Sequence, residues 1–244
     1  MKMRRVNNDG GFSLVELILA MGITLTVLGL SSGLLAGAFH SRSREDRKSD
    51  AIADVQRALN IMTREISNSG LKLPSGLGAV ATNGIVTNDS DNQSIRIVSN
   101  LNGMPDSANG YFEDSDVVDM DEDLKFLMYV DNDLGQRYIV RYERNGTNQT
   151  TVLANRVDSL VFRYYDEKVI YSTTIDANGV CDITNVVNAS GAAKSEVSPS
   201  KAKFIVIAVG VTLPAVGTFG SEGYQPASQV QLTSDVVLRN SIVY

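Results

Sequence analysis

The sequence predicts an α+β protein in which one long N-terminal helix, first transmembrane and then amphipathic, packs on a mostly antiparallel β-sheet. Three observations support this prediction. An uncharged apolar run of 23 residues lies near the N-terminus, an apolar stripe at helical period follows it, and strand-like segments separated by turn residues fill the second half. The 244 residues fit one large domain, or one ordinary domain with an appendage.

The composition is globular and argues against several classes of function. Charged residues make up 20% and the apolar set 43%. A formal net charge of −6 disfavours nucleic acid as a partner. Because Cys181 is the single cysteine and His40 the single histidine, neither an internal disulfide nor a cysteine or multi-histidine metal site is expected. We therefore expect no cofactor, no metal and no catalytic activity.

The N-terminus has the layout of a membrane segment, but not that of an ordinary secretory signal. A basic stretch ends in Gly10-Gly11, and the uncharged run extends from Leu17 to Phe39. At roughly 1.5 Å per helical residue, this run reaches about 35 Å, enough to cross the hydrocarbon core of a bilayer. No small-residue cleavage site follows the run, and the carboxylate of Glu16 stands at its start.

The segment Gly11-Phe12-Ser13-Leu14-Val15-Glu16-Leu17, placed before an apolar helix, resembles the class III leader and methylation motif of type IV pilins and type II secretion pseudopilins. The resemblance is close over residues 1 to about 40. It implies that residues 1–11 are a leader removed by a membrane prepilin peptidase between Gly11 and Phe12, and that Phe12 is then N-methylated. Residues 12–40 become the transmembrane helix and assembly segment.

The resemblance also implies a role for Glu16, which would pair with the Phe12 ammonium, most simply on a neighbouring subunit during assembly. Physical chemistry favours such a pair, because an amine and a carboxylate at membrane depth reduce each other's desolvation cost and fix the register of packed helices. The alternative is that the Glu16 side chain extends to the lipid headgroups.

Small residues recur inside the apolar run at one helical spacing. Gly29, Gly33 and Gly37 follow each other every fourth residue, which makes a smooth face where another helix can approach closely. We expect this face to pack against other pilins. The alternative is that these are the small residues which any membrane helix tolerates.

An amphipathic helix is expected over residues 41–69, continuing the membrane helix. Its apolar stripe consists of Ile52, Val55, Leu59, Met62 and Ile66. Asn68-Ser69-Gly70 predicts its C-terminal end. The stripe is expected to pack on a sheet, with a coiled-coil interface as the alternative.

Residues 70–244 are expected to form a β-rich exported head. Residues 71–115 are rich in Gly, Asn, Ser and Asp, so a loop region is predicted there, with one strand at 94–98. A sheet of about six or seven strands is predicted, its other strands at 124–130, 137–143, 150–153, 157–165, 203–211 and 230–238.

Two further features invite a ligand-binding interpretation. The stretch 119–135 contains Asp119, Asp121, Asp123, Asp131 and Asp133, and Asp131-Asn132-Asp133 begins like a calcium loop. The EF-hand pattern then fails, because Gly135 falls at its fifth position and Tyr142 at its twelfth. A solvated turn is the favoured interpretation, and Cys181 is interpreted as a strand residue.

The helix segment 56–66, the strand 157–166 and the ending 233–240 resemble PilW-type minor pilins and J-type pseudopilins. This resemblance implies the type IV pilin fold and the role of a minor pilin at or near the filament tip, where it helps prime assembly. The implied partners are other major and minor pilins, the prepilin peptidase and the inner-membrane assembly platform. The implied location is a single pass through the inner membrane with the C-terminal part in the periplasm, and then the pilus at the cell surface.

Three alternatives to this role remain at the level of sequence. In the first alternative, the chain is a J-type pseudopilin of a type II secretion system. In the second, it is an adhesin or binding module whose 71–115 loop recognises a surface. A membrane-anchored enzyme is the weakest alternative, because residues 12–244 contain only one histidine, His40, which directly follows the membrane run, and one cysteine, Cys181.

Overall fold

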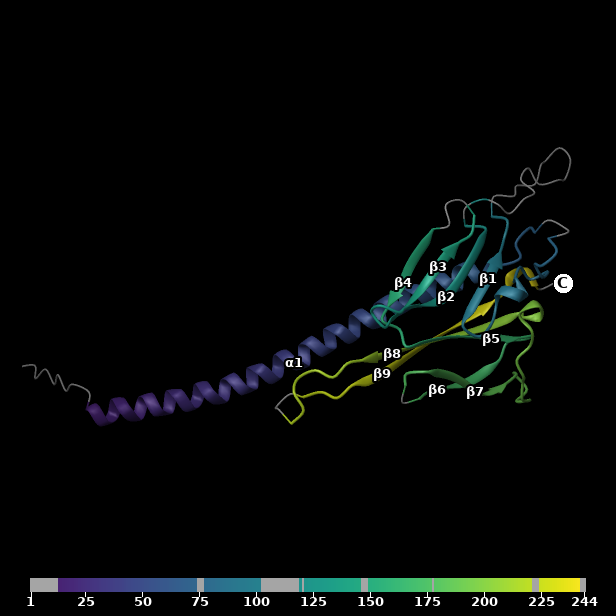
Figure 1. The fold of residues 1–244 in the computed structure, drawn as a ribbon. Coiled ribbons are helices and arrows are strands. Elements are labelled where there is room, and N and C mark those ends of the chain that lie inside the picture. The colour runs from purple at the N-terminus through teal and green to yellow at the C-terminus, as the bar shows by residue number, and fades with distance from the viewer. Residues whose placement is uncertain are drawn as a thin grey trace, which may run out of the picture. The chain divides into compact units, whose positions relative to one another are not determined.

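A computed structural model describes residues 13–73, 77–101, 119, 121–145, 149–176, 178–220 and 224–241. These residues form one long helix, nine strands and three short 3₁₀ helices. All strand pairs are antiparallel. The α+β class predicted from the sequence is therefore confirmed, with a long N-terminal helix packed on antiparallel sheets (Figure 1).

The helix α1 (Leu14–Ser67) is a single uninterrupted element of 54 residues. It contains no proline, so no backbone donor is missing from its hydrogen-bond ladder. The chain leaves the helix where the sequence predicts. The Ser69 N–H donates to the Ile66 carbonyl at 3.0 Å, and Gly70 adopts a left-handed φ of 79°.

The chain divides into two compact units, and α1 runs through both. The helix–loop unit comprises residues 1–46 and 215–226, and the sheet unit comprises residues 47–214 and 227–244. All described strands and both hydrophobic clusters belong to the sheet unit.

Four consecutive strands form the first sheet, in the order in which they follow along the chain (Figure 1). They are β1 (Ser94–Val98), β2 (Asp123–Asp131), β3 (Gln136–Glu143) and β4 (Thr150–Asn155). A register shift in the β3–β4 pairing places Leu153 as the extra residue. Because of this bulge, Leu153 and Ala154 both enter the main core although they are adjacent in sequence.

The second sheet has the order β5-β8-β9, formed by β5 (Ser159–Tyr165), β8 (Phe204–Leu213) and β9 (Ser228–Val237). Its central strand β8 is apolar at nearly every position, as expected for a strand buried on both faces. Ile205, Ile207 and Val209 enter the main core, whereas Phe204 and Val206 enter a second core on the opposite face.

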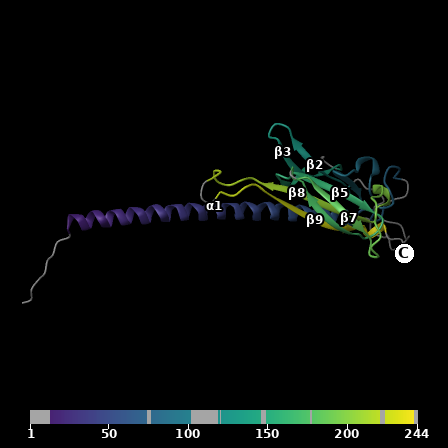
Figure 2. The ribbon, with the colours of Figure 1, turned by 90° about the horizontal axis from the view of Figure 1, so that it is seen from below.

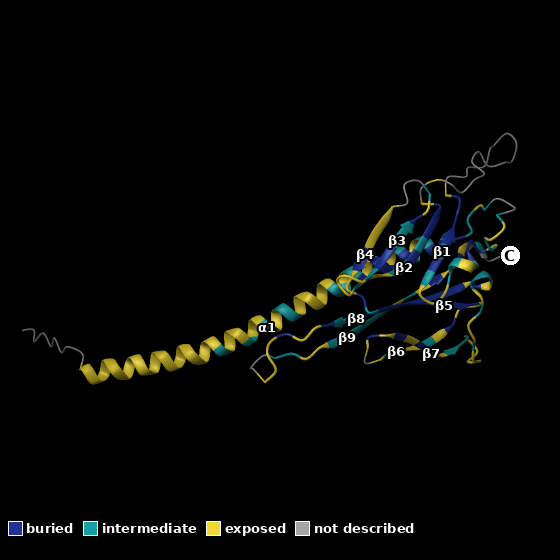
Figure 3. Cartoon of the chain, viewed as in Figure 1, coloured by how far each residue is buried: buried dark blue, intermediate teal, exposed yellow. Residues whose placement is uncertain are grey.

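The apolar stripe of α1 packs into the main core, as predicted. Val55, Leu59, Met62 and Ile66 are all buried there among residues of both sheets, and Ile52 at the start of the stripe is half-buried (Figure 3). The Arg141 guanidinium adds a polar link, since its Nε donates to Glu65 Oε2 at 3.0 Å. The coiled-coil alternative for this stripe is not needed, because the stripe is already covered within the chain.

The strands number more than the six or seven predicted, and they form three sheets rather than one. The two strands that the sequence analysis did not identify are β6 (Ile170–Ile175) and β7 (Cys181–Val187), which form a hairpin of their own. Cys181, Ile183 and Val169 of this segment cover the second core against β5 and β8. The β6 strand shows no apolar alternation in the sequence, because Ser172, Thr173 and Thr174 follow one another and are polar and exposed.

Candidate functional site

The predicted processing site, formed by Gly11 and Phe12, lies outside the described residues. Glu16 lies in the first turn of α1, where the partial positive charge of the helix N-terminus stabilises a carboxylate. Among the described residues no cation forms an ion pair with Glu16.

The first half of α1 is mostly apolar and has no buried residue. The most apolar 18-residue stretch of this helix has no buried residue, and α1 is long and apolar enough to cross a membrane (Figure 3). Leu17, Leu25 and Leu34 are 56%, 67% and 77% exposed. Large apolar side chains left exposed at this density mark a surface that lipid or other helices cover.

Three of the hydroxyl groups inside the apolar run are satisfied by the helix itself. Thr24 Oγ1, Thr26 Oγ1 and Ser32 Oγ each donate to the carbonyl four residues earlier, all at 2.8 Å. Such bonds leave no unpaired donor at these positions, which is the arrangement that a helix surrounded by hydrocarbon requires.

The glycines of the predicted packing face leave open space on the helix. A Cβ atom added to Gly29 or Gly37 would meet no other atom within 4 Å. Their lack of a side chain is therefore not used for packing within this chain. Gly33 lies between them on the same face, and Gly33 and Gly37 are both partly covered.

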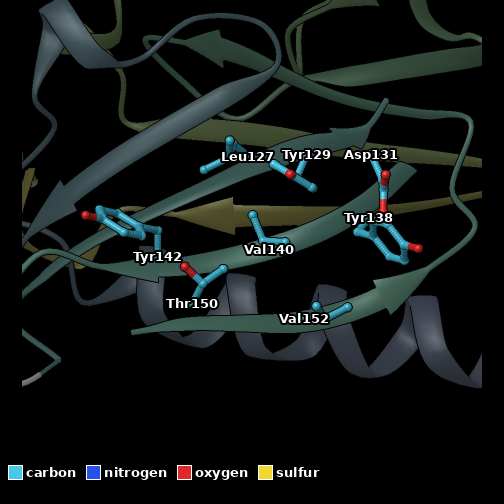
Figure 4. A pocket seen from close by; sticks show the side chains of 8 residues that line it. All are labelled: Leu127, Tyr129, Asp131, Tyr138, Val140, Tyr142, Thr150 and Val152. Carbon is cyan, nitrogen blue, oxygen red and sulfur yellow. The ribbon is translucent and has the colours of Figure 1, made fainter. Parts of the chain in front are cut away.

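An exposed tyrosine face covers the outer side of the first sheet (Figure 4). Tyr129 of β2 and Tyr138 of β3 are directly opposite each other in the strand register, and Tyr142 of β3 is opposite Thr150 of β4. Together with Leu127, Asp131, Val140 and Val152 they line a shallow depression of about 580 Å³. Tyr129 is 54% exposed, which is high for an aromatic side chain.

The acidic stretch 119–135 is engaged by the protein's own donors rather than gathered around one point. Asp131 Oδ1 accepts the N–H groups of Asp133 and Leu134 at 2.9 and 3.1 Å, which closes the β2–β3 turn. Asp121 pairs with Arg141, and Asp123 with Arg96. Within the described ranges no group of three or more His, Cys, Asp or Glu residues is placed to hold a metal ion.

A partly buried charge network links β1 to β2. The Arg96 guanidinium donates to both carboxylate oxygens of Asp123, at 2.8 and 2.6 Å, and to Asp89 Oδ2 at 3.3 Å. The Lys125 ammonium also donates to Asp89, and this hydrogen bond lowers the pKa of the Asp89 carboxyl below its usual range. Sequence reasoning did not identify this network, because Asp89 and Arg96 are separated in the sequence from Asp123 and Lys125 of β2.

Cys181 is a strand residue, as predicted, and its thiol is 2% exposed in the second core. Burial raises the pKa of the Cys181 thiol, with a smaller opposing effect from Ser159. A thiol with a raised pKa and no access to solvent is a poor nucleophile.

Comparisons of the chain with protein-family models, with curated protein sequences and with solved structures found no match.

Proposed function

We propose that this chain is a type IV pilin-like filament subunit, held in the membrane and in the filament by the first half of α1. The observation that carries this proposal is a helix of 54 residues whose second half is packed in a core while its first half has no buried residue. The motif Gly11-Phe12-Ser13-Leu14-Val15-Glu16-Leu17 before this helix supports processing by a prepilin peptidase.

Within this class we propose a minor pilin of PilW type with the type IV pilin fold. The first half of α1 would join a bundle of helices from other major and minor pilins, and the sheet unit would stand at or near the filament tip and help prime assembly. A J-type pseudopilin of a type II secretion system is the alternative role. Both roles use the same helix and differ in where the processed chain is found.

The proposed assembly contact is an ion pair between Glu16 and the N-terminal ammonium of Phe12 in a neighbouring subunit. Glu16 has no cationic partner among the residues that the structure describes, and an unpaired carboxylate in hydrocarbon is costly. The glycine face at Gly29, Gly33 and Gly37, which is exposed at Gly29 and partly covered at Gly33 and Gly37, is the proposed surface for close helix packing.

The proposed role is structural rather than enzymatic. His40 is the single histidine and Cys181 the single cysteine, and the thiol of Cys181 is buried. A catalytic role would need a cluster of reactive side chains, and neither of these residues contributes to one.

Mass spectrometry of the mature N-terminus, from membranes and from sheared filaments, tests the proposal. We expect a chain that begins at N-methylated Phe12 and is present at low abundance in the filaments. A Gly11→Val variant is the control and should retain the leader. Processed chain confined to the cell envelope would favour the pseudopilin, and an unprocessed wild-type chain would refute both roles.

The contribution of Glu16 can be tested separately from processing. We expect Glu16→Ala to be cleaved normally but to be depleted from sheared filaments, because the Phe12 ammonium loses its partner. Glu45→Ala is the matched control, since Glu45 lies on the same helix beyond the apolar run. Equal depletion of both variants would argue against a specific ion pair.

A binding module is a second candidate function, and the exposed tyrosine face favours it. Surfaces that contact other proteins are enriched in tyrosine, and Tyr129 and Tyr138 are opposite each other in the strand register and line the same depression. The double variant Tyr129→Ser/Tyr138→Ser should reduce attachment to a surface while the number of filaments stays unchanged. A loss of filaments would instead assign this face to assembly. The 71–115 loop, which the sequence suggested for such a role, lies partly outside the described residues.

A further inference from the structure

We propose that the tip of the loop between β8 and β9 is a membrane-interface anchor, in which the side chains of Phe219 and Tyr224 insert into the headgroup region of the bilayer. This inference rests on the membrane residence of α1 in the function proposed above. It adds a second point of attachment that belongs to the exported part of the chain.

The tip carries two aromatic side chains, of which Phe219 is exposed and Tyr224 is half-buried. Residues 215–226 contain no lysine or arginine and one acidic residue, Glu222. Phe219 is 86% exposed, more than any large apolar side chain of α1. Its ring meets that of Tyr224 edge to face, with 5.4 Å between the centroids and 77° between the planes. An aromatic pair with one ring exposed in this way is a candidate contact surface.

The loop is fastened to α1 just beyond the apolar run. Val216 and Gln225 exchange backbone hydrogen bonds at 3.0 and 2.9 Å, which makes them the base of the tip. Arg44 Nη1 donates to Gln225 Oε1 at 2.8 Å. Arg44 follows Phe39, the last residue of the apolar run, by five positions, or roughly 7.5 Å along the helix axis.

The tip extends from this point toward the membrane end of the helix. In the otherwise exposed first part of α1, the partly covered residues Gly33, Gly37, His40 and Arg44 lie on one helical face. Figures 1 and 2 both show the loop beside α1. The three residues from Val216 to Phe219 span up to roughly 10 Å, so Phe219 can reach the level of Phe39.

The chemistry of the tip fits the headgroup region and not bulk water. Phenylalanine supplies an apolar ring, and tyrosine combines an apolar ring with a hydroxyl group that remains hydrated. Tyrosine and tryptophan side chains are enriched at the membrane–water interface. Since the apolar run ends at Phe39, this level coincides with the position that the tip reaches.

The chain contains no tryptophan, so one substitution gives a specific fluorescent probe. The full-length Phe219→Trp variant is reconstituted in phosphatidylcholine vesicles, with lipids brominated at different depths or iodide added to the water. Leu25→Trp marks the centre of the apolar run. Tyr129→Trp marks the exposed tyrosine face on the sheet unit and should remain quenched by iodide.

For Phe219→Trp we expect blue-shifted emission, a several-fold drop in iodide quenching, and strongest quenching by lipids brominated close to the headgroup. Iodide-accessible, unshifted emission with Leu25→Trp still quenched by lipid would overturn the anchor and leave the membrane helix intact. Shielding from both iodide and brominated lipid would overturn it in favour of a contact with protein.

The same experiment separates this inference from its premise. If Leu25→Trp is not quenched by brominated lipid, α1 does not span the membrane, and the membrane residence and the anchor both fall. As a second measurement, Gln225→Ala in the Phe219→Trp background removes the hydrogen bond from Arg44. This change should weaken lipid quenching at the tip without changing it at position 25, and unchanged quenching at the tip would contradict the proposed fastening.

Discussion

At the scale of single residues, the sheet unit depends on charges that are paired away from bulk solvent. Arg96 is held by Asp123 and Asp89 together, and Lys125 completes the group. A partly buried carboxylate needs such donors, because the loss of one partner leaves a charge without solvent or counter-ion. The network joins β1 to β2, which are paired strands of the first sheet.

The lowered pKa of Asp89 makes stability sensitive to acid. A carboxyl whose folded-state pKa lies below the ordinary value of 3.8 stabilises the fold above that value, and this stabilisation is lost as the pH falls through the folded-state pKa. We expect thermal melting from about pH 5 to about pH 2 to show a smaller acid-induced decrease of Tm in Asp89→Asn than in the wild type. The Lys125→Met variant should also show a smaller decrease, since Lys125 is the main donor. Parallel curves for all three proteins would contradict this assignment.

At Gly84, backbone atoms occupy the space that a Cβ atom would need. Its φ is +80°, and an added Cβ would lie 2.0 Å from the Gly70 nitrogen and 2.6 Å from the Val98 oxygen. We expect Gly84→Ala to lower the free energy of unfolding by about 3 kcal/mol, from left-handed strain and overpacking together.

Gly78→Ala is the control for this prediction. Gly78 also has a left-handed φ, of +54°, but no atom lies within 4 Å of the added Cβ. The expected cost is therefore about 1 kcal/mol. Urea unfolding of both variants measures the difference, and equal losses would show that backbone conformation alone decides.

At the scale of elements, α1 is one helix with two different surroundings. Its first half has no buried residue, and its second half contributes Val55, Leu59, Met62 and Ile66 to the main core. Tertiary packing, rather than intrinsic propensity, supplies most of the stability of a helix. Packing within this chain therefore stabilises the second half of α1 and not the first, although the helix is continuous.

Two methionines on this helix test the division. Met62 is 0% exposed and Met21 is 58% exposed. We expect Met62→Ala to lower the free energy of unfolding by about 3 kcal/mol through the cavity it leaves. Met21→Ala should change it by less than about 0.5 kcal/mol. Urea unfolding of the full-length variants in detergent gives both values, and similar losses at the two positions would contradict the division.

At the scale of the whole molecule, the two units differ in what holds them together. The sheet unit has two cores formed by all nine strands and the second half of α1. The helix–loop unit has no such core among its described residues. Its exposed apolar surface would be covered by lipid or by other subunits in the function proposed above.

A shortened chain tests this difference directly. Both cores consist only of residues from Ala51 onward, so a chain of residues 47–244 retains every buried apolar contact of the sheet unit. We expect it to fold in water without detergent, with a Tm within about 4 °C of the full-length protein. Circular dichroism during heating measures this. A fragment without cooperative unfolding would show that the first part of α1 is needed for the fold.

Local sequence patterns were enough to predict several elements. The stripe from Ile52 to Ile66 has a helical period and the strand at 94–98 alternates, whereas the run from Leu17 to Phe39 and the strand predicted at 203–211 are continuous apolar stretches. All of these signals can be detected without knowing which residues pack against them. The motif around Gly11 and Phe12 is also local, but it carries a prediction about processing that the fold does not test.

The packing of these elements against each other could be seen only in the tertiary structure. It divided the strands into three sheets, buried β8 on both faces, and placed the β6–β7 hairpin over the second core. It also brought Arg44 to Gln225 and Tyr129 to Tyr138. The physical reason is that burial, ion pairing and side-by-side packing depend on residues far apart in the chain, and no local period encodes those partners.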